Sequence, residues 1–324
     1  MVWTPLHAKI HRTIRDRHLF ERNQRLLVAV SGGQDSLCLI QLLLDLQPKW
    51  GWHLAIAHCD HRWRSDSGAN ASHVENLAKT WGILFYLQTA NEPLRSEAAA
   101  RNWRYQALSA IAWENHYSCV ITGHTASDRA ETLLYNLIRG TGADGLQALS
   151  WQRRLTDSIV LARPLLEVTR SQTGQFCQEF QIPIWEDSTN QDLKFARNRI
   201  RQELLPYLQE NFNPQVESAL AQTAELLQAE VEYLEQVAHQ LREEAMSGLP
   251  LGLNRRVLQK APIALQRRVM RQVLQEILSS APSFEQIEKL TALITAPNRS
   301  QTDPFPGGAI AQVEGDWICL KLKT

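Results

Sequence analysis

Hydrophobic positions in the first half of the chain alternate between short apolar runs and longer stretches with apolar residues at every third or fourth position. The short runs predict four buried strands, at 25–30, 52–59, 83–87 and 118–122. The longer stretches predict helices at 35–46, which ends before Pro48, and at 66–81, 94–116 and 127–139. Strands and helices that alternate in this way indicate an α/β fold with a parallel sheet. Ligands bind such sheets at the carboxyl ends of the strands.

The second half of the chain follows a different pattern. After an expected edge strand at 157–161 and a helix at 169–180, it reads as nearly all helix, at 214–245, 262–278 and 283–294. The last segment, 309–323, alternates apolar and polar residues around Glu314-Gly315-Asp316 and predicts a terminal hairpin. We therefore expect a first domain of residues 1–212 and a mainly helical second domain of residues 213–324.

Composition narrows the class of protein. The 324 residues carry 34 basic and 34 acidic side chains and no apolar run of the roughly 20 residues that span a bilayer. The first 25 residues have no apolar signal-peptide core, so a cytoplasmic protein without a membrane partner is expected. The five cysteines are scattered without a C-x-x-C pair, which argues against a disulfide framework, a zinc site or an iron–sulfur site.

Basic residues concentrate at 194–201 and 255–271, a pattern compatible with a polyanion footprint but equally with solvated helix faces.

The strongest chemical signal lies directly after the first predicted strand. It is the loop Ser31-Gly32-Gly33-Gln34-Asp35-Ser36, which leads into a helix. Its glycines allow a sharp turn, and its N–H groups and the helix N-terminus attract an anion. Asp35 would repel a bare phosphate, so Mg²⁺ or an N–H group is its expected partner. A plain glycine turn with an N-cap is the alternative.

This loop matches the S-G-G-x-D-S loop of the PP-loop pyrophosphatases, and further segments resemble tRNA(Ile)-lysidine synthetases. The run that contains His58 is similar to their H-x-[DN]-H-x-[LW]-R segment, and the run that contains Arg101 and Arg104 to their E-x-x-A-R-x-x-R-Y segment. The stretch with His124 and Asp128 is similar to their G-H-x-x-x-D-x-x-E-T block. Further matches lie at 163–166, 186–190 and 197–206, so the resemblance covers about residues 20–210.

The resemblance implies an adenine nucleotide alpha hydrolase fold and a reaction in two steps. Cytosine O2 of the wobble cytidine, in an isoleucine tRNA with a CAU anticodon, would attack the α-phosphorus of ATP. L-lysine would then attack C2 and expel AMP. The loop Ser31–Ser36 would hold the leaving pyrophosphate, with Mg²⁺ on Asp35, and the adenosine would lie near His58. His124 and Asp128 would bind the lysine amine and take its proton, while Arg101 and Arg104 would balance charge at the α-phosphate.

The partners follow from the same resemblance. The predicted tRNA contacts are basic residues of the two concentrated stretches: Lys194, Arg197, Arg199, Arg201, Arg267 and Arg268. A homodimer is a further expectation.

A PP-loop tRNA 2-thiocytidine synthetase is the nearest alternative enzyme, although it would need paired cysteines or a cluster. A nucleotide-binding regulatory protein is the non-catalytic alternative, and pyrophosphate release in the presence of ATP and tRNA would distinguish it from an enzyme.

Overall fold

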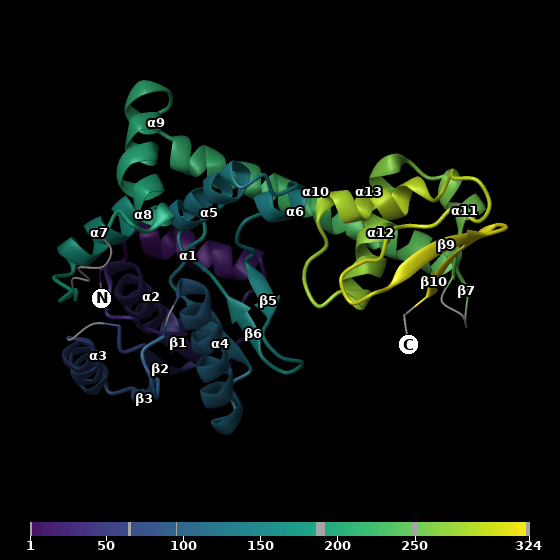
Figure 1. Cartoon of the computed structure of the whole chain (residues 1–324). Helices are drawn as coiled ribbons and strands as arrows, with labels where there is room; N and C mark the ends of the chain where they lie inside the picture. The colour runs from purple at the N-terminus through teal and green to yellow at the C-terminus, as the bar shows by residue number, and fades with distance from the viewer. Residues whose placement is uncertain (1, 64–65, 95, 186–191, 248–251, 322–324) are drawn as a thin grey trace. The chain divides into compact units, whose positions relative to one another are not determined.

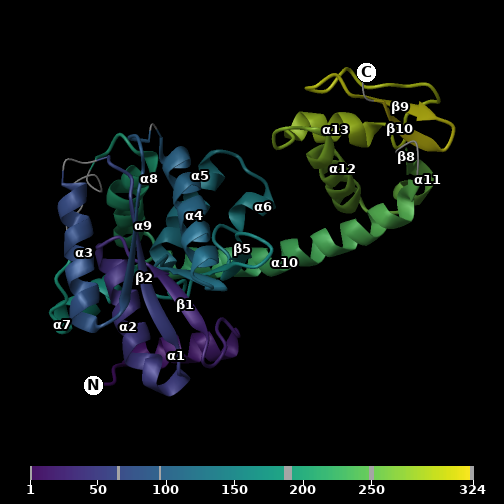
Figure 2. The same cartoon turned by 90° about the horizontal axis from the view of Figure 1, so that it is seen from below.

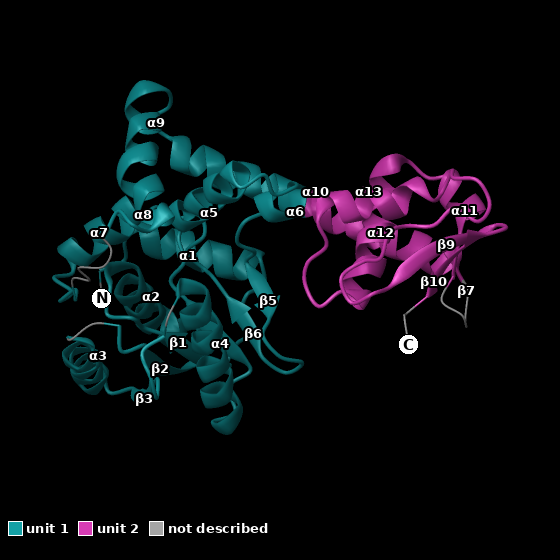
Figure 3. Cartoon of the chain, viewed as in Figure 1, with its two compact units in different colours: residues 1–228 teal, residues 229–324 magenta. Residues whose placement is uncertain are grey.

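A computed structural model describes residues 2–63, 66–94, 96–185, 192–247 and 252–321. Three features expected from the sequence fall partly or wholly outside these ranges, namely the segment 186–190, Arg64 of the His58 run and the last residues of the terminal hairpin. The chain forms two compact units, residues 1–228 and 229–324 (Figure 3). Among the described residues, no helix is long and apolar enough to cross a membrane.

The first unit is built on a six-stranded sheet (Figure 1). The strands follow the order β3-β2-β1-β4-β6-β5 across the sheet. Their bounds are Arg25–Ala29 (β1), His53–Asp60 (β2), Leu84–Thr89 (β3), Cys119–Thr122 (β4), Gln152–Arg154 (β5) and Val160–Ala162 (β6). All neighbours pair in parallel except β5 and β6, which are antiparallel. The mainly parallel sheet predicted from the sequence is confirmed.

Helices cover both faces of this sheet (Figures 1 and 2). Their bounds are Pro5–Asp16 (α1), Gln34–Trp50 (α2), Ser67–Trp81 (α3), Glu97–Glu114 (α4), Ala126–Ile138 (α5), Ala143–Leu146 (α6), Arg170–Glu179 (α7), Ala196–Arg199 (α8) and Leu205–Asn211 (α9), with a π-helical turn at Ile200–Leu204. Successive side chains of β1 point to opposite faces. Leu26 and Val28 join one core with α1, α2, α3 and α7, whereas Leu27 joins a second core with α4. Burial on both faces explains why β1 reads as a continuous apolar run.

Two local predictions were wrong. Helix α2 does not end before Pro48 but continues to Trp50, and Gly51 closes it in the left-handed conformation. Tertiary packing holds this last turn, because the Trp50 ring stacks on Trp52 at 5.1 Å and its indole N–H donates to His11. The expected edge strand 157–161 overlaps β6, which lies inside the sheet, and β5 forms the edge instead.

The order of the strands in the sheet indicates where a ligand would bind. The chain runs outward from β1 to β2 and β3 and then returns to the other side of β1 at β4. The point where the order reverses therefore lies between β1 and β4, and ligands of open α/β sheets bind at this point. The segments that follow these two strands are the loop Ser31–Ser36 and the stretch with His124 and Asp128, which carry the strongest sequence signals.

The second unit has its own core. Helices Arg255–Gln259 (α11), Ile263–Ile277 (α12) and Phe284–Ala292 (α13) accompany an antiparallel sheet of order β7-β8-β10-β9, made of Met246–Ser247, Gly252–Asn254, Trp317–Lys321 and Ile310–Glu314. The terminal hairpin is confirmed as β9 and β10. The long helix Val216–Ala245 (α10) begins close to the expected domain boundary. The two compact units divide later, between residues 228 and 229, since the first half of α10 packs against the first unit.

Candidate active site

The loop after β1 turns sharply and packs closely against α3. Gly32 has a φ of 88°, and a Cβ placed there would lie 2.3 Å from Oδ1 of Asn70. The Asn70 amide in turn donates to the carbonyl oxygen of Ser31 at 3.0 Å. Ser36 Oγ accepts from the Ser31 N–H at 3.1 Å and donates to the Gly33 carbonyl at 2.9 Å. The loop is thus held in shape before any ligand binds, and only glycine fits its second position.

The segment after β4 lies directly against this loop. A Cβ on Gly123 would lie 2.9 Å from the carbonyl oxygen of Asp35 and 3.0 Å from the amide nitrogen of Ser36. Thr125 then caps α5, because its side chain accepts from the Asp128 N–H. Asp128 Oδ2 accepts from both the N–H and the hydroxyl of Thr125, at 2.8 and 2.9 Å. This reciprocal capping box fixes one oxygen of Asp128 and leaves the other for a cation.

A cluster of three carboxylates joins the two segments. Arg170, at the start of α7, contacts Asp35 at 3.1 Å, Asp128 at 3.0 Å and Glu131 at 3.2 Å. Glu131 is almost fully buried, and its two oxygens accept hydrogen bonds from Nε and Nη2 of Arg201 at 2.7 and 2.8 Å. We refer to these five residues as the acidic cluster. It carries three negative and two positive charges, and therefore a net charge of −1.

The surroundings shift the pKa values of this cluster. Burial pushes the pKa of Asp128 upward, but the charge of Arg170 and the hydrogen bond from Thr125 hold it below its ordinary value. Burial raises the pKa of Asp35 in spite of Arg170, and the nearby charge of Asp128 adds to this rise. Burial and the neighbouring charge of Arg163 lower the pKa of His124 to about 3. His124 is therefore a neutral imidazole at pH 7 and a weaker base than the sequence suggests.

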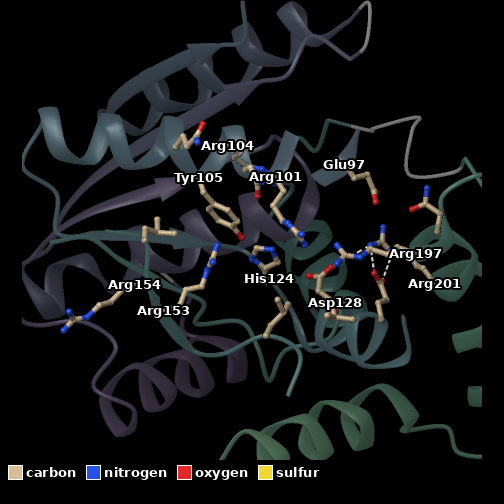
Figure 4. A pocket seen from close by; sticks show the side chains of 17 residues that line it. Glu97, Arg101, Arg104, Tyr105, His124, Asp128, Arg153, Arg154, Arg197 and Arg201 are labelled. Carbon is tan, nitrogen blue, oxygen red and sulfur yellow. Dashed lines mark hydrogen bonds and ion pairs between the residues drawn. The ribbon is translucent and has the colours of Figure 1, made fainter. Parts of the chain in front are cut away.

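A cavity of about 720 Å³ opens beside the cluster (Figure 4). Its lining includes His124, Asp128 and Glu131, together with six arginines: Arg101, Arg104, Arg153, Arg154, Arg197 and Arg201. Arg101 and Arg104 come from α4, and the cavity brings them together with His124 and Asp128. Figure 4 shows Arg153 and Arg154 toward one end, Asp128 and Arg201 toward the other, and His124 between them. The cavity is thus basic at one end and mixed in charge at the other.

Protein groups of the loop could supply only some of the ligands that Mg²⁺ needs. Asp35 supplies one carboxylate, whose oxygens accept from Thr173 and Arg170, and Mg²⁺ in nucleotide enzymes is held by one or two carboxylates plus phosphate oxygens. The described residues contain no group of three or more His, Cys, Asp or Glu side chains that could hold a metal by themselves. ATP phosphates would therefore have to complete the coordination.

Other residues predicted for the site lie in different settings. His58 is buried, and its Nδ1 is 2.7 Å from the carbonyl oxygen of Val30, so it links β2 to the end of β1. The side chain of Gln34 points to α7, where it donates to the carbonyl of Arg170 and to the hydroxyl of Thr173. Thr173 also donates to Asp35. Gln34 thus braces the loop from behind instead of facing a phosphate.

The residues predicted to contact tRNA lie partly in the first unit and partly in the second. Lys194 and Arg199 are exposed, and Arg197 lines the cavity. Arg201 belongs to the acidic cluster. In the second unit, Arg267 forms two hydrogen bonds with Glu288, and Arg268 pairs with Glu235. These carboxylates neutralise much of the basic stretch 255–271, which the sequence alone left unpaired.

Sequence reasoning missed Arg170, Asn70 and Thr173 as site residues and used Glu131 only as part of a motif. Asn70 lies within an otherwise ordinary amphipathic helix, and Arg170 and Thr173 lie in the first turn of another. No local pattern distinguishes them from surface residues. Only the packing of α3 and α7 around the loop reveals their function.

Comparison with known proteins agrees with this geometry. A PP-loop domain model matches residues 4–208. A solved U34-tRNA thiolase, NcsA from Methanococcus maripaludis with its 4Fe–4S cluster, has the same fold, with a TM-score of 0.58 over 69% of this chain and 78% of that chain at 14% identity. The fold and the loop define an ATP-using enzyme of the PP-loop class.

The particular family follows from closer relatives. The chain is 76% identical to a tRNA(Ile)-lysidine synthase from a Nostoc species, over 99% of this chain and 98% of the relative. It is 53% identical to the tRNA(Ile)-lysidine synthase from a Synechocystis species, over 98% of both chains. A TilS substrate binding domain model also matches residues 253–315. The chain belongs to the tRNA(Ile)-lysidine synthase family and is an ATP-dependent ligase, and these relatives do not favour the 2-thiocytidine synthetase alternative.

Proposed function

We propose that this protein joins L-lysine to C2 of the wobble cytidine in an isoleucine tRNA with a CAU anticodon. Cytosine O2 attacks the α-phosphorus of ATP and pyrophosphate leaves. The ε-amine of lysine then attacks C2 and AMP leaves. The observation that carries the proposal is the acidic cluster, which lies beside the phosphate loop and lacks one positive charge.

The cluster suits the ε-ammonium group of lysine. Asp128 has one oxygen fixed by Thr125, while its other oxygen faces Arg170 at 3.0 Å. Glu131 is held by Arg170 and Arg201. An ammonium group that binds Asp128 and Glu131 would bring the charge of the cluster to zero. Since lysine must lose a proton before it attacks, Asp128 is the acceptor that we propose for that proton.

The rest of the cavity suits anions. Arg101 and Arg104 form no ion pair with a carboxylate among the described residues, and the Nε of Arg104 is buried without a hydrogen-bond partner. An α-phosphate or an adenylated base would offset the charge of Arg101 beside His124. We assign adenosine to the end of β2 near His58, and pyrophosphate and Mg²⁺ to Ser31–Ser36 and Asp35.

The second unit is proposed as a tRNA-contacting domain, with the first unit as the catalytic domain. Lys194, Arg197 and Arg199 remain candidate phosphate contacts, because no acidic side chain among the described residues neutralises them. Arg267 and Arg268 would need to leave their carboxylates to bind RNA. We also infer a cytoplasmic location, where tRNA is modified, and a homodimer, which light scattering of the purified protein tests.

The substitution Asp128→Asn tests the lysine site. It removes the charge but keeps the size of the side chain and the acceptor oxygen for the cap. We expect pyrophosphate release with ATP and tRNA to continue, and lysine transfer to fall by at least the hundredfold typical of a lost acid–base group. Glu114→Gln, on an exposed carboxylate in the last turn of α4, is the control. Lysine transfer by Asp128→Asn at the wild-type rate would refute the assignment.

A further inference from the structure

The basic end of the cavity has positive charges gathered around one tyrosine. The guanidinium carbon of Arg153 lies 4.3 Å from the centre of the Tyr105 ring. Burial pushes the pKa of Tyr105 upward, but the nearby positive charges of Arg163, Arg153 and Arg104 hold it below its ordinary value. Arg163 is only 3% exposed. Three guanidinium groups from α4, β5 and the segment after β6 therefore converge on the same phenol.

These charges have no matching carboxylates. Among the described residues, Arg104, Arg153 and Arg163 form no ion pair with Asp or Glu. The Nε atoms of Arg104 and Arg163 are buried without a hydrogen-bond partner. Of the three acids in the lining, Asp128 and Glu131 are held by Arg170 and Arg201, and Glu97 forms no ion pair with an arginine among the described residues. Buried donors without partners and like charges close together both cost free energy, and an anion would remove both costs.

The position of the basic end of the cavity favours RNA as the source of the anion. Arg153 lies on β5, the edge strand of the sheet, where all three residues are exposed. His124 lies between it and the acidic cluster, which adjoins the phosphate loop (Figure 4). ATP phosphates are therefore expected at the end of the cavity with the acidic cluster. An RNA strand that enters the cavity from solvent would pass Arg153 first. An RNA strand that inserts one base carries a phosphodiester on each side of that base.

We propose that Arg153, Arg104 and Tyr105 form a subsite for a backbone phosphate adjacent to the nucleotide that is modified. Arg153 supplies the exposed donors and Tyr105 orients its guanidinium plane by stacking. Arg104 supplies a second donor from α4, and the buried Arg163 adds a further positive charge beside Tyr105. The inference rests on the proposed function for the identity of the RNA. The phosphate chemistry itself rests on the geometry of this end of the cavity.

The substitution Arg153→Gln measures the contribution of this subsite. We expect the KM for tRNA to rise about tenfold, as for a lost charge-assisted hydrogen bond, with the KM for ATP unchanged. The slope of log affinity for tRNA against log salt should decrease by about 0.7, the value for one contact to a single-stranded phosphate. Arg153→Lys should recover part of the affinity. Lys79→Gln is the control, since it removes one exposed charge from α3, away from the cavity.

A modified substrate identifies the phosphate. In a tRNA ligated from two halves, a single methylphosphonate on either side of the wobble nucleotide removes one backbone charge. The wild-type enzyme should lose about tenfold in affinity for one of the two modified tRNAs, and Arg153→Gln should lose nothing further. Equilibrium tRNA binding without lysine gives the same comparison, so this test does not depend on lysine transfer.

Two outcomes would overturn the proposal. Arg153→Gln could leave tRNA affinity and its salt slope unchanged, which would mean that no RNA phosphate binds there. It could instead raise the KM for ATP and leave tRNA affinity intact, which would assign the subsite to an ATP phosphate. Additive losses from the substitution and both methylphosphonates would also contradict it, since independent effects do not share a contact.

Discussion

At the scale of single residues, Arg170 holds the site together. It links the phosphate loop through Asp35 to the proposed lysine carboxylates Asp128 and Glu131, and its own N–H donates to Ser127 at 3.0 Å. The sequence predicted Asp35, His124 and Asp128 because each follows a buried strand. It could not predict Arg170, because a cation in the first turn of a helix carries no local signal and acquires its role only from tertiary packing.

Replacement of Arg170 by Met should destabilise the first unit. Three carboxylates would remain with only Arg201 as counter-charge, and breaking a largely buried ion pair typically costs about 3 kcal/mol. Urea unfolding at pH 7 measures this loss. The free energy of unfolding of Arg170→Lys should lie between those of Arg170→Met and wild type, because one ammonium group cannot contact three carboxylates with the geometry of a guanidinium. Equal stability of Arg170→Met and wild type would show that the cluster does not depend on this charge.

At the scale of elements, the sequence predicts best what is local. The run β1, loop and α2 was recognised because an apolar strand, two glycines and a helical pattern follow one another. The end of α2 was not, because the packing of Trp50 on Trp52 overrides the helix-breaking tendency of Pro48. The edge position of β5 was missed because its three residues, Gln152–Arg154, are polar and resemble a loop.

The close approach of β4 to the loop gives a prediction at this scale. In Gly123→Ala, the new Cβ would lie 2.9 Å from the Asp35 carbonyl, so the start of α2 must move. We expect affinity for ATP to fall at least tenfold, because the N–H groups of the loop would no longer converge on one phosphate. Equilibrium binding of ATP with Mg²⁺ measures this. In Gly82→Ala no atom lies near the new Cβ, although φ is 67°, so this variant reports strain without a clash. Wild-type ATP affinity in Gly123→Ala would contradict the account.

At the scale of the whole first unit, Glu225 on α10 connects distant parts of the chain. It pairs with Arg17 of α1 at 2.7 Å and with the fully buried Arg129 of α5 at 2.6 Å. It also accepts from the indole N–H of Trp151 at 2.7 Å. Burial pushes the pKa of Glu225 upward, yet the hydrogen bonds and charges of Arg129, Trp151 and Arg17 hold it below the ordinary value. The first half of α10 is thereby fixed to the catalytic sheet.

The substitution Glu225→Gln should lower the free energy of unfolding by about 3 kcal/mol at pH 7, since it leaves Arg129 buried without a carboxylate. A lowered pKa in the folded state means that this stabilisation is complete above the ordinary glutamate value of 4.5 and is lost as pH falls below it. The difference between wild type and variant in urea unfolding should therefore shrink below pH 4.5. A difference that stays constant down to pH 3 would argue against a role for this charge.

The central claim is lysine transfer to one tRNA, and labelled lysine tests it most directly. Wild-type protein, ATP and Mg²⁺ would be incubated with an unmodified isoleucine tRNA that has a CAU anticodon, or with the elongator methionine tRNA that has the same anticodon. The account predicts incorporation of lysine into the isoleucine tRNA alone, with one pyrophosphate released for each lysine joined. Pyrophosphate release without lysine incorporation would contradict it, and would leave an adenylating enzyme with a different nucleophile.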